Sequence, residues 1–176
     1  GTTDCTPPIQ QALNLARDAG GGWVYIPQGT YLLSTVAPLR IYRTTRLTLA
    51  PNAVLRRDTT ASMLVNGDAS QALGAYSGHG NILIEGGLWD MQGAVIEDAA
   101  VCMSLGHADN VTVQNVVIRD VPRYHAIELN AIRRARITSC QFRGFNDPDG
   151  TRAFSEAVQI DLAKGVDYFA PFGPYD

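Results

Sequence analysis

The chain has 176 residues, of which 45% are hydrophobic and 18% charged, a composition typical of a globular domain that can bury a core. Its formal net charge of −3 and isoelectric point near 5.5 provide no positive field, so neither nucleic acid nor an anionic membrane is an expected partner. Three cysteines without CxxC spacing indicate neither a zinc site nor a disulfide framework, and no run approaches the ~20 apolar residues that cross a bilayer.

The first predicted element is a helix over residues 6–20, with Thr6 as its N-cap and Pro7 in its first turn. Its apolar side chains fall on one face, which comprises Ile9, Ala12, Leu13 and Ala16. Strands at 23–26 and 30–33 follow, separated by a Pro-Gln-Gly turn. We expect the helix to cover the open face of the coil that these two strands begin.

Four later segments repeat one pattern, and they begin at Arg46, Asn81, Asn110 and Arg134. Their second and fourth positions are apolar and the third is mostly polar, which indicates a strand with one buried face. The second positions are Leu47, Ile82, Val111 and Ala135. The turn positions are Pro51, Gly86, Asn115 and Ser139. A second short strand then aligns one large side chain per segment, and this column is Val54, Trp89, Ile118 and Phe142.

A further strand repeats upstream of these segments, where VCMSLGHA from Val101, HAIELNA from His125 and EAVQIDLA from Glu156 superimpose. A polar insertion over 146–151 separates the last two. The repeats predict an all-β fold, a right-handed parallel β-helix with an N-terminal capping helix. We expect one domain over 1–176, with coils over 23–176, as a fragment of a longer chain.

The opening GTTDCTPPIQQALNLARDAGGGWVYIPQGTYLLS, with the later RLTLAPNAVL and ILIEGGLWDMQG, resembles the pectate-lyase-like β-helix superfamily. The similarity is to the branch shared by bacterial secreted proteins and phage tail spikes. It implies an extracellular or virion-associated setting, a polysaccharide partner and a homotrimer. It also implies carbohydrate chemistry, which in that superfamily ranges from calcium-dependent lyases and hydrolases to proteins without activity.

The strand register predicts one candidate site. If Ile127 and Leu129 face the core, the outward side chains are Glu128, Asn130, Gln159 and Asp161. Backbone spacing puts Glu128 and Asp161 roughly 8 Å apart, in the range of roughly 6.5 to 9.5 Å that inverting glycosidases use. We expect one of these carboxyls to protonate the leaving oxygen while the other activates water.

Other residues are assigned supporting roles around this pair. His125 joins the predicted catalytic set, in which it orients the sugar, and the predicted substrate-binding set is Asn130, Gln159, Glu156 and Arg123. A lyase would instead use Arg123 or Arg152 as a base with a cation, and we rank it below hydrolysis. No metal or cofactor is expected, although calcium would suit a lyase, with Asp147 and Asp149 as ligands.

Several residues that resemble site residues are interpreted as structural. We expect His79 to be a loop residue, Asp90 to be salt-bridged at the end of a coil, and the sequon at Asn110 to be a turn. The aromatic residues Tyr168, Phe169, Phe172 and Tyr175 are expected to pack over the last coil. The alternative to an enzyme is a non-catalytic carbohydrate-binding or structural module, like that of a tail spike or adhesin.

Overall fold

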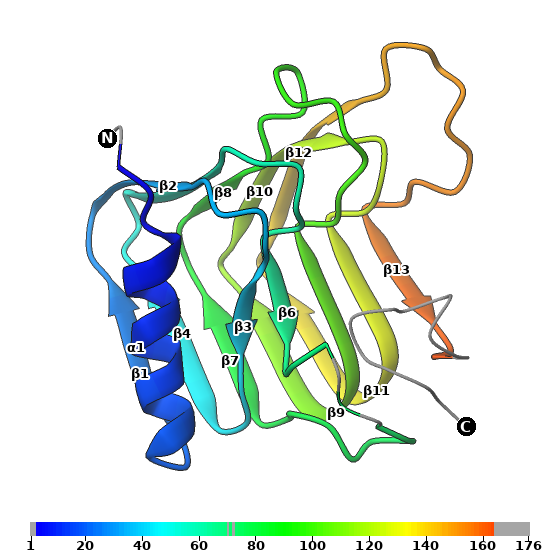
Figure 1. Cartoon of the computed structure of the whole chain (residues 1–176). Helices are drawn as coiled ribbons and strands as arrows, with labels where there is room; N and C mark the ends of the chain where they lie inside the picture. Colours follow the sequence, from blue (N-terminus) through cyan, green and yellow to red (C-terminus); the bar gives the residue numbers. More distant parts are fainter. Residues whose placement is uncertain (1–2, 70, 72, 164–176) are drawn as a thin grey trace.

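The computed structural model describes residues 3–69, 71 and 73–163, which form one helix and a stack of short strands (Figure 1). The helix α1 spans Thr6–Asp18. The strands are β1 (Gly22–Ile26), β2 (Gly29–Leu33), β3 (Leu39–Ile41), β4 (Thr45–Leu49), β5 (Ala53–Arg57), β6 (Leu64–Asn66), β7 (Ile82–Glu85), β8 (Leu88–Asp90), β9 (Met103–Gln114), β10 (Val117–Pro122), β11 (Ile127–Thr138), β12 (Gln141–Asn146) and β13 (Val158–Asp161).

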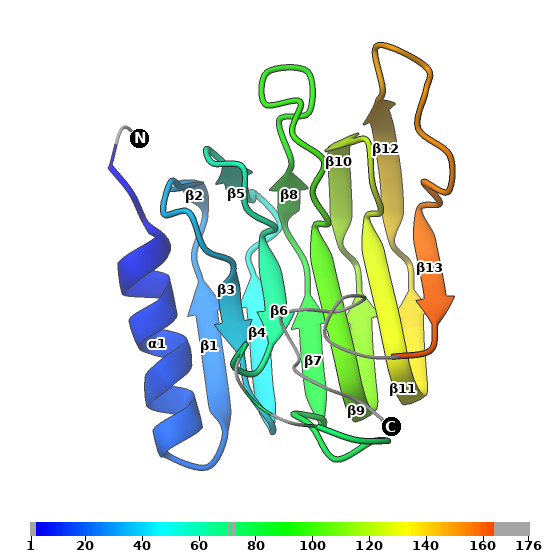
Figure 2. The ribbon, with the colours of Figure 1, turned by 45° about the vertical axis from the view of Figure 1, so that its right-hand side comes forward.

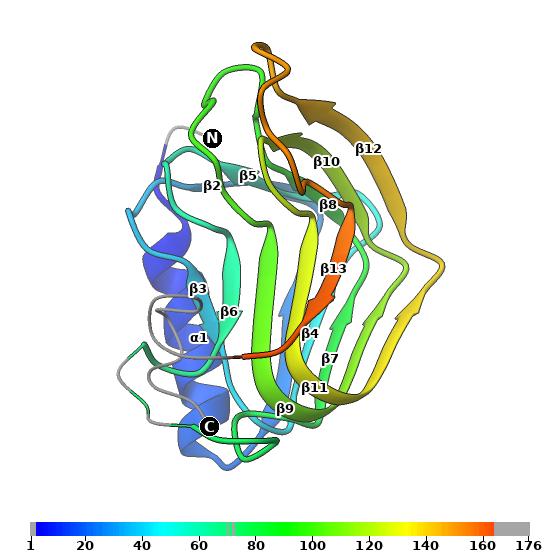
Figure 3. The same ribbon diagram turned by 90° about the vertical axis from the view of Figure 1, so that its right-hand side faces the viewer.

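Every ladder between these strands is parallel, and the strands lie in two sheets (Figure 2). One sheet has the order β1-β4-β7-β9-β11-β13, with β3 and β6 attached, and the other has the order β12-β10-β8-β5-β2. The long strands β9 and β11 turn a corner where His107 and Asn110, and Ala131 and Arg134, have positive φ. Viewed nearly along the stack, the chain winds in successive coils (Figure 3). The predicted right-handed parallel β-helix is confirmed.

Helix α1 covers the first coil, where it packs against β1, β3 and β4 (Figure 1). Its buried side chains include Ile9, Leu13 and Ala16, as the sequence predicts. The predicted cap is wrong, because Cys5 is the N-cap and Thr6 is the first helical residue. The Asp4 carboxylate takes the capping role, since its Oδ1 accepts a 2.9 Å bond from the Thr6 amide. The helix ends at Asp18, two residues before the predicted boundary.

The core lies between the inward faces of the two sheets, and one column runs through its centre. Leu55, Trp89 and Ile118 are stacked in adjacent strands, and none has exposed surface. Phe142 is next in the column and is 37% exposed, because it lies in the last strand of its sheet. Burial of three such side chains provides several kcal/mol of the stability, at ~1.5–3 kcal/mol each.

The predicted column is wrong at Val54, which pairs with Leu88 while Leu55 pairs with Trp89. A slip of one residue reverses which side chains face the core. The error arises because the earlier coil contains extra residues between its paired positions. Leu47 lies opposite Ile84 rather than the predicted Ile82. Leu55 follows Leu47 by eight residues along the chain, whereas its partner Trp89 follows Ile84 by only five.

The later coils have the predicted register. Val111 pairs with Ile82 and with Ala135. In the upstream column, Ile127 pairs with Met103 and with Val158, so the three superimposed segments are correctly aligned. The insertion before β13 therefore leaves the pairing of the coils unchanged.

One of the three cysteines, Cys102, packs in the hydrophobic core. All three cysteines are unpaired, and Cys102 has no exposed surface. Burial raises the pKa of the Cys102 thiol well above its usual value, which keeps it protonated and unreactive. Within the part of the chain that the structure describes, no helix is long and apolar enough to span a membrane.

Candidate functional site

A groove of about 720 Å³ lies on the outward face of the last coil. It extends over β11, β13 and the segment between β12 and β13. Its lining is Tyr124, His125, Glu128, Arg152, Phe154, Glu156, Val158, Gln159, Ile160 and Asp161. Five of the residues predicted from the sequence are therefore brought together, namely His125, Glu128, Glu156, Gln159 and Asp161.

Glu128 lies deepest among the carboxyl groups of this groove. Strand alternation places Ile127 and Leu129 in the core and turns Glu128 to the other face, where it is still only 5% exposed. Ser104 Oγ on the neighbouring strand donates a 2.9 Å hydrogen bond to Glu128 Oε2. Burial raises the pKa of Glu128, against the opposing effects of Ser104, His125 and Asn130, and the charge of Asp161 adds to the rise.

His125 connects Glu128 to the loop that precedes β13. Its Nδ1 lies 3.0 Å from the carbonyl oxygen of Glu156 and 3.6 Å from Glu156 Oε2. Because a carbonyl only accepts hydrogen bonds, Nδ1 carries a proton. The other ring nitrogen, Nε2, lies 3.9 Å from Glu128 Oε1. The buried imidazole therefore faces two carboxyl groups, one buried and one at the exposed rim.

Asp161 and Gln159 form the far wall of the groove on β13. Gln159 pairs with Glu128 across the strands and Asp161 pairs with Asn130, which is the predicted arrangement. Gln159 Nε2 donates to Asp161 Oδ2 at 3.3 Å, and the Leu162 amide donates to Oδ1 at 2.7 Å. Asp161 is half-buried, so its carboxylate is oriented by hydrogen bonds and still reaches the groove.

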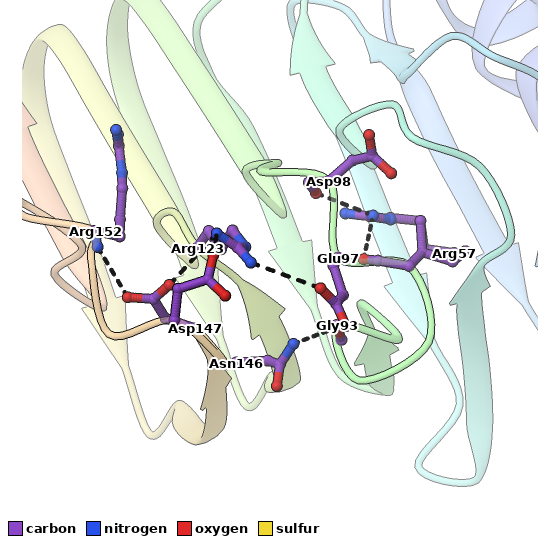
Figure 4. Close-up of polar contacts among 10 residues, drawn as sticks. Arg57, Gly93, Glu97, Asp98, Arg123, Asn146, Asp147 and Arg152 are labelled. Carbon is purple, nitrogen blue, oxygen red and sulfur yellow. Dashed lines mark hydrogen bonds and ion pairs between the residues drawn. The ribbon is translucent and has the colours of Figure 1, made fainter.

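Two predicted site residues lie elsewhere. Asn130 lies on the same face of β11 as Glu128, as predicted, but it has no exposed surface and does not line the groove. Arg123 directly follows the end of β10 and does not line the groove. Its guanidinium instead contacts acidic side chains of two loops (Figure 4). It donates to Asp149 Oδ2 at 2.8 Å and lies 3.7 Å from Asp147 and 3.6 Å from Glu97. These contacts engage Asp147 and Asp149, the carboxylates that would be calcium ligands in the lyase alternative.

The loops joined by Arg123 have further anchors. Asn146 Nδ2 donates to the carbonyl of Gly93 at 2.6 Å (Figure 4). Arg57, which is fully buried, donates from Nη2 to the carbonyls of Ile96 and Asp98 at 2.9 and 3.2 Å. The segment 147–157 forms one wall of the groove, so Arg123 holds that wall from outside. Among the residues described, no cluster of three or more His, Cys, Asp or Glu side chains could hold a metal ion.

We predict that Arg123→Ala loosens the segment 147–157 without unfolding the coils. Its ion pairs are partly exposed and contribute little to the stability of the coils, and the Arg123 amide keeps its bond to the Asn146 carbonyl. Hydrogen exchange should become faster at the Gly150 and Arg152 amides and remain unchanged at Leu129. Arg143→Ala is the matched control, because Arg143 bonds only to Gln141 among the described contacts. Equal exchange in both variants would contradict the prediction.

Three residues interpreted as structural, His79, Asp90 and Asn110, have the predicted roles. His79 packs edge-on against Tyr42 and accepts a bond from the Arg43 amide, and burial lowers its pKa. Asp90 lies 2.6 Å from Arg119 and 3.2 Å from Arg56, which confirms its salt-bridged position. Asn110 lies at a corner with φ of 60°. The aromatic set Tyr168, Phe169, Phe172 and Tyr175 lies outside the described residues.

Four groove residues were not predicted as site residues, and two of them, Val158 and Ile160, continue the columns of Ile127 and Leu129. Tyr124 and Phe154 both line the groove, and Phe154 is 79% exposed. The ring of Tyr124 is covered by Arg152, whose guanidinium lies 4.5 Å from the ring centre. The position of Tyr124 beside His125 was a signal that could have identified it. Phe154 belongs to an irregular loop, where no periodicity predicts which way a side chain points.

The fold and groove define a parallel β-helix with a recessed, carboxylate-rich face. No family model matches the chain. The plasmin and fibronectin-binding protein A of Streptococcus pneumoniae is 28% identical over 195 residues, which cover 96% of this chain and 27% of that protein. The crystal structure of PfbA, a surface adhesin of Streptococcus pneumoniae, superposes with a TM-score of 0.79 and 25% identity.

That superposition covers 100% of this chain and 43% of the adhesin, so the chain spans less than half of the solved relative. The A-module of a mannuronan C-5 epimerase from Azotobacter vinelandii superposes with a TM-score of 0.61 at 15% identity, covering 94% of this chain and 51% of that one. At this identity the likeness shows the fold alone. These similarities agree on a parallel β-helix and not on one chemistry.

Proposed function

We propose that the chain is a non-catalytic binding segment of an extracellular, β-helical surface adhesin, with proteins of a host as its partners. The observation that carries the proposal is the match to PfbA, which runs through the whole chain at a TM-score of 0.79. The curated relative is described by its binding to plasmin and fibronectin. This reading favours the alternative of the sequence analysis over its first choice, a polysaccharide-degrading enzyme, and replaces polysaccharide with protein as the main partner.

The geometry supports a binding role as well. The groove is recessed, it is lined by both aromatic and charged side chains, and its wall is held by the contacts of Arg123. Recognition sites of this kind gain affinity when their loops are ordered before the partner arrives. A rigid solenoid with ordered loops along one edge meets that requirement.

We predict saturable binding of the purified chain to immobilised human plasmin or fibronectin, with a Kd below about 10 µM. Surface plasmon resonance would measure it, with serum albumin as the control surface and the heat-unfolded chain as the control analyte. Absence of binding to both proteins at about 100 µM would contradict the proposal. Light scattering on the same sample would test the predicted homotrimer, which a monomer at every concentration would contradict.

A second candidate function, hydrolysis of a polysaccharide, is favoured by one observation. Glu128 is a buried carboxyl with a raised pKa, and it lies beside His125 in a groove that Asp161 also lines. A raised pKa suits a general acid, which must be protonated to assist the leaving group. The predicted division of roles between Glu128 and Asp161 therefore remains part of this proposal, with His125 as the orienting group.

If the chain hydrolyses a glycan, Glu128→Gln should lower the rate by about 100-fold or more. The wild-type rate should also fall as the pH rises through the pKa of Glu128, because the acid is then lost. A reducing-end assay over neutral and acidic polysaccharides measures both effects, and absorbance of unsaturated uronates would identify a lyase instead. If no glycan yields a product, the hydrolase candidate is rejected.

A further inference from the structure

A second recess, of about 290 Å³, lies at the corner that β9 and β11 turn, and it shares no lining residue with the groove on the last coil. Its walls come from the turn before β4, the segment that leads into β7, and the corners of β9 and β11 (Figure 1). The Thr44 amide donates to the Gly80 carbonyl at 3.0 Å, and the Asn81 amide donates to the Asp109 carbonyl at 2.9 Å. Asp109 in turn pairs with Arg133 in the ladder of β9 and β11. Corner residues of four successive coils therefore lie side by side around this recess.

Two glycines, Gly78 and Gly80, line this recess. A Cβ atom on Gly80 would overlap the carbonyl oxygen of Asp109, and one on Gly78 would lie 2.6 Å from the carbonyl oxygen of His107. The Gly78 amide donates to that same His107 carbonyl at 2.6 Å. The segment 78–80 therefore packs backbone against backbone on β9. Because neither glycine has a side chain, the space between the walls of the recess stays open.

Two arginines, Arg43 and Arg134, line the recess. Arg43 is exposed, and its guanidinium contacts the carbonyls of residues 77 and 78 at 3.5 and 3.4 Å, which is long for a hydrogen bond. Among the described residues, no ion pair within 4.0 Å includes Arg43. Asp68, the acid of the segment between β6 and β7, accepts a 2.9 Å bond from Tyr42 and does not line the recess. Arg43 is therefore a surface cation without a carboxylate partner in the described part of the chain.

Asp109 is the carboxylate of the lining, and two arginines share it. Arg133 and Arg134 each place Nη2 2.6 Å from Asp109 Oδ2, and their side chains are 56% and 66% exposed. These contacts, that of Arg133 above all, hold the pKa of Asp109 below its usual value, so the carboxylate is ionised at neutral pH. With Arg43, three guanidinium groups accompany one carboxylate. The corner has an excess of positive charge, although the formal net charge of the chain is −3.

An aromatic side chain completes the lining. Tyr76 is 44% exposed, and the Arg133 guanidinium lies 5.0 Å from the centre of its ring. Tyrosine and arginine are enriched where proteins bind each other, since both combine contact area with directed hydrogen bonds. A guanidinium also binds a carboxylate through two parallel hydrogen bonds, a geometry that the side chains of aspartate and glutamate match. The lining is therefore suited to an acidic side chain of a protein.

We propose that this recess binds an acidic segment of a protein partner, with an aspartate or glutamate side chain entering between Arg43 and Arg134. The volume of about 290 Å³ suits one such side chain, and the exposed Arg133 contacts a neighbouring acid of the same segment. This inference rests on the proposed binding function and specifies the chemistry that the partner must present. A basic ligand would be repelled by the same guanidinium groups, and a neutral one would gain nothing from their charge.

The direct test titrates the ¹⁵N-labelled full chain with two peptides of equal length, acetyl-tetraglutamate amide and the neutral acetyl-tetraglutamine amide. At about 50 mM salt we expect saturable shifts of the Gly80 and Asn81 amide resonances, with a Kd of about 1 mM or below for the acidic peptide. The neutral peptide should bind at least about tenfold more weakly. Salt at about 500 mM should weaken the acidic peptide about tenfold, because exposed charges are screened. Equal binding of the two peptides, or unmoved Gly80 and Asn81 resonances, would overturn the inference.

Two substitutions test the guanidinium groups separately. Arg43→Gln should weaken binding of the acidic peptide about fivefold or more, and Arg134→Gln about threefold, because Arg134 already shares Asp109. Both variants should fold, since both side chains are exposed and the Arg43 amide keeps its bond to His79. Arg143→Gln is the control, because Arg143 is exposed on β12 and lies outside the recess. Wild-type affinity in both recess variants would count against the assignment.

Two further ligands test the class of the partner. A heparin-derived tetrasaccharide presents sulfate groups on sugars, and inorganic sulfate presents the anion alone. We expect both to shift the Gly80 and Asn81 resonances more weakly than the acidic peptide at the same ionic strength, because neither matches the carboxylate geometry together with a peptide backbone. Tighter binding of the tetrasaccharide would overturn the assignment in favour of a sulfated glycan. Inorganic sulfate that binds as tightly as the peptide would overturn it in favour of a small-anion site.

The same variants separate this inference from the adhesin function itself. If plasmin and fibronectin bind wild type and Arg43→Gln equally and the acidic peptide does not bind, the recess assignment fails while the adhesin function stands. If the acidic peptide binds but neither host protein does, the recess assignment stands and the choice of partner fails. Parallel loss of peptide and host-protein binding in Arg43→Gln, with both retained in Arg143→Gln, would support both proposals.

Discussion

Replacing Trp89 with alanine is expected to lower the free energy of unfolding by ~3–5 kcal/mol, the largest effect among the substitutions considered. Trp89 has no exposed surface and lies between Leu55 and Ile118 in the central column. Removing the indole leaves a cavity that the neighbouring strands cannot fill, because their spacing is fixed by parallel hydrogen bonds. Its Nε1 bond to the Gly86 carbonyl, at 3.4 Å, is also lost.

Urea unfolding followed by far-UV circular dichroism measures this effect, and Trp23→Ala provides the matched control. Trp23 is 65% exposed on β1, where its Nε1 donates to Thr48 Oγ1 and Arg46 lies 5.2 Å from its ring. Its removal should cost ~1 kcal/mol or less. Equal destabilisation by the two substitutions would contradict the central position of Trp89.

Asn66→Ala is expected to cost ~2–4 kcal/mol, because it leaves buried backbone groups without hydrogen bonds. Asn66 has no exposed surface, and its Oδ1 accepts a 2.7 Å bond from the Gly106 amide. Its Nδ2 donates to the carbonyls of Gly106 and His79 at 2.8 and 3.0 Å. One side chain therefore connects strand β6 to β9 and to the loop over 67–81.

The matched control is Asn52→Ala, in the exposed turn between β4 and β5, which should change stability by less than ~0.5 kcal/mol. Thermal unfolding of both variants tests the difference. Hydrogen exchange at the Gly106 amide should also become faster in Asn66→Ala alone. A midpoint unchanged from wild type would show that water or backbone movement satisfies these groups instead.

The fold was largely predictable from the sequence because inward and outward residues alternate along regularly repeated strands. The same alternation located the groove, since Ile127 and Leu129 reach the core and turn Glu128 to the other face. The register was wrong only where the turn length changes, between Leu47 and Leu55. Alternation determines which face a residue occupies, but the length of an irregular turn is set by three-dimensional closure.

Other features of the site could not be predicted for a different reason. Alternation alone placed Asn130 on the surface, yet the residue is fully buried beside a corner of β11, where Ala131 has a φ of 53°. Arg123 was assigned to the groove because it lies near His125 in the sequence, whereas its guanidinium contacts Glu97, Asp147 and Asp149. A corner within a strand decides the position of Asn130 and loop conformation decides that of Arg123, and neither follows a periodic pattern.

The connections between strands differ sharply between the two sides of each coil. The turns that join the large sheet to the small one are confined to residues 27–28, 50–52, 86–87, 115–116 and 139–140. The connections that return to the large sheet vary in length, since 123–126 is short whereas 91–102 and 147–157 are long (Figure 2). Insertions at this edge leave the core register intact. Sequence changes at this edge can therefore alter the loops while the scaffold keeps its folding stability.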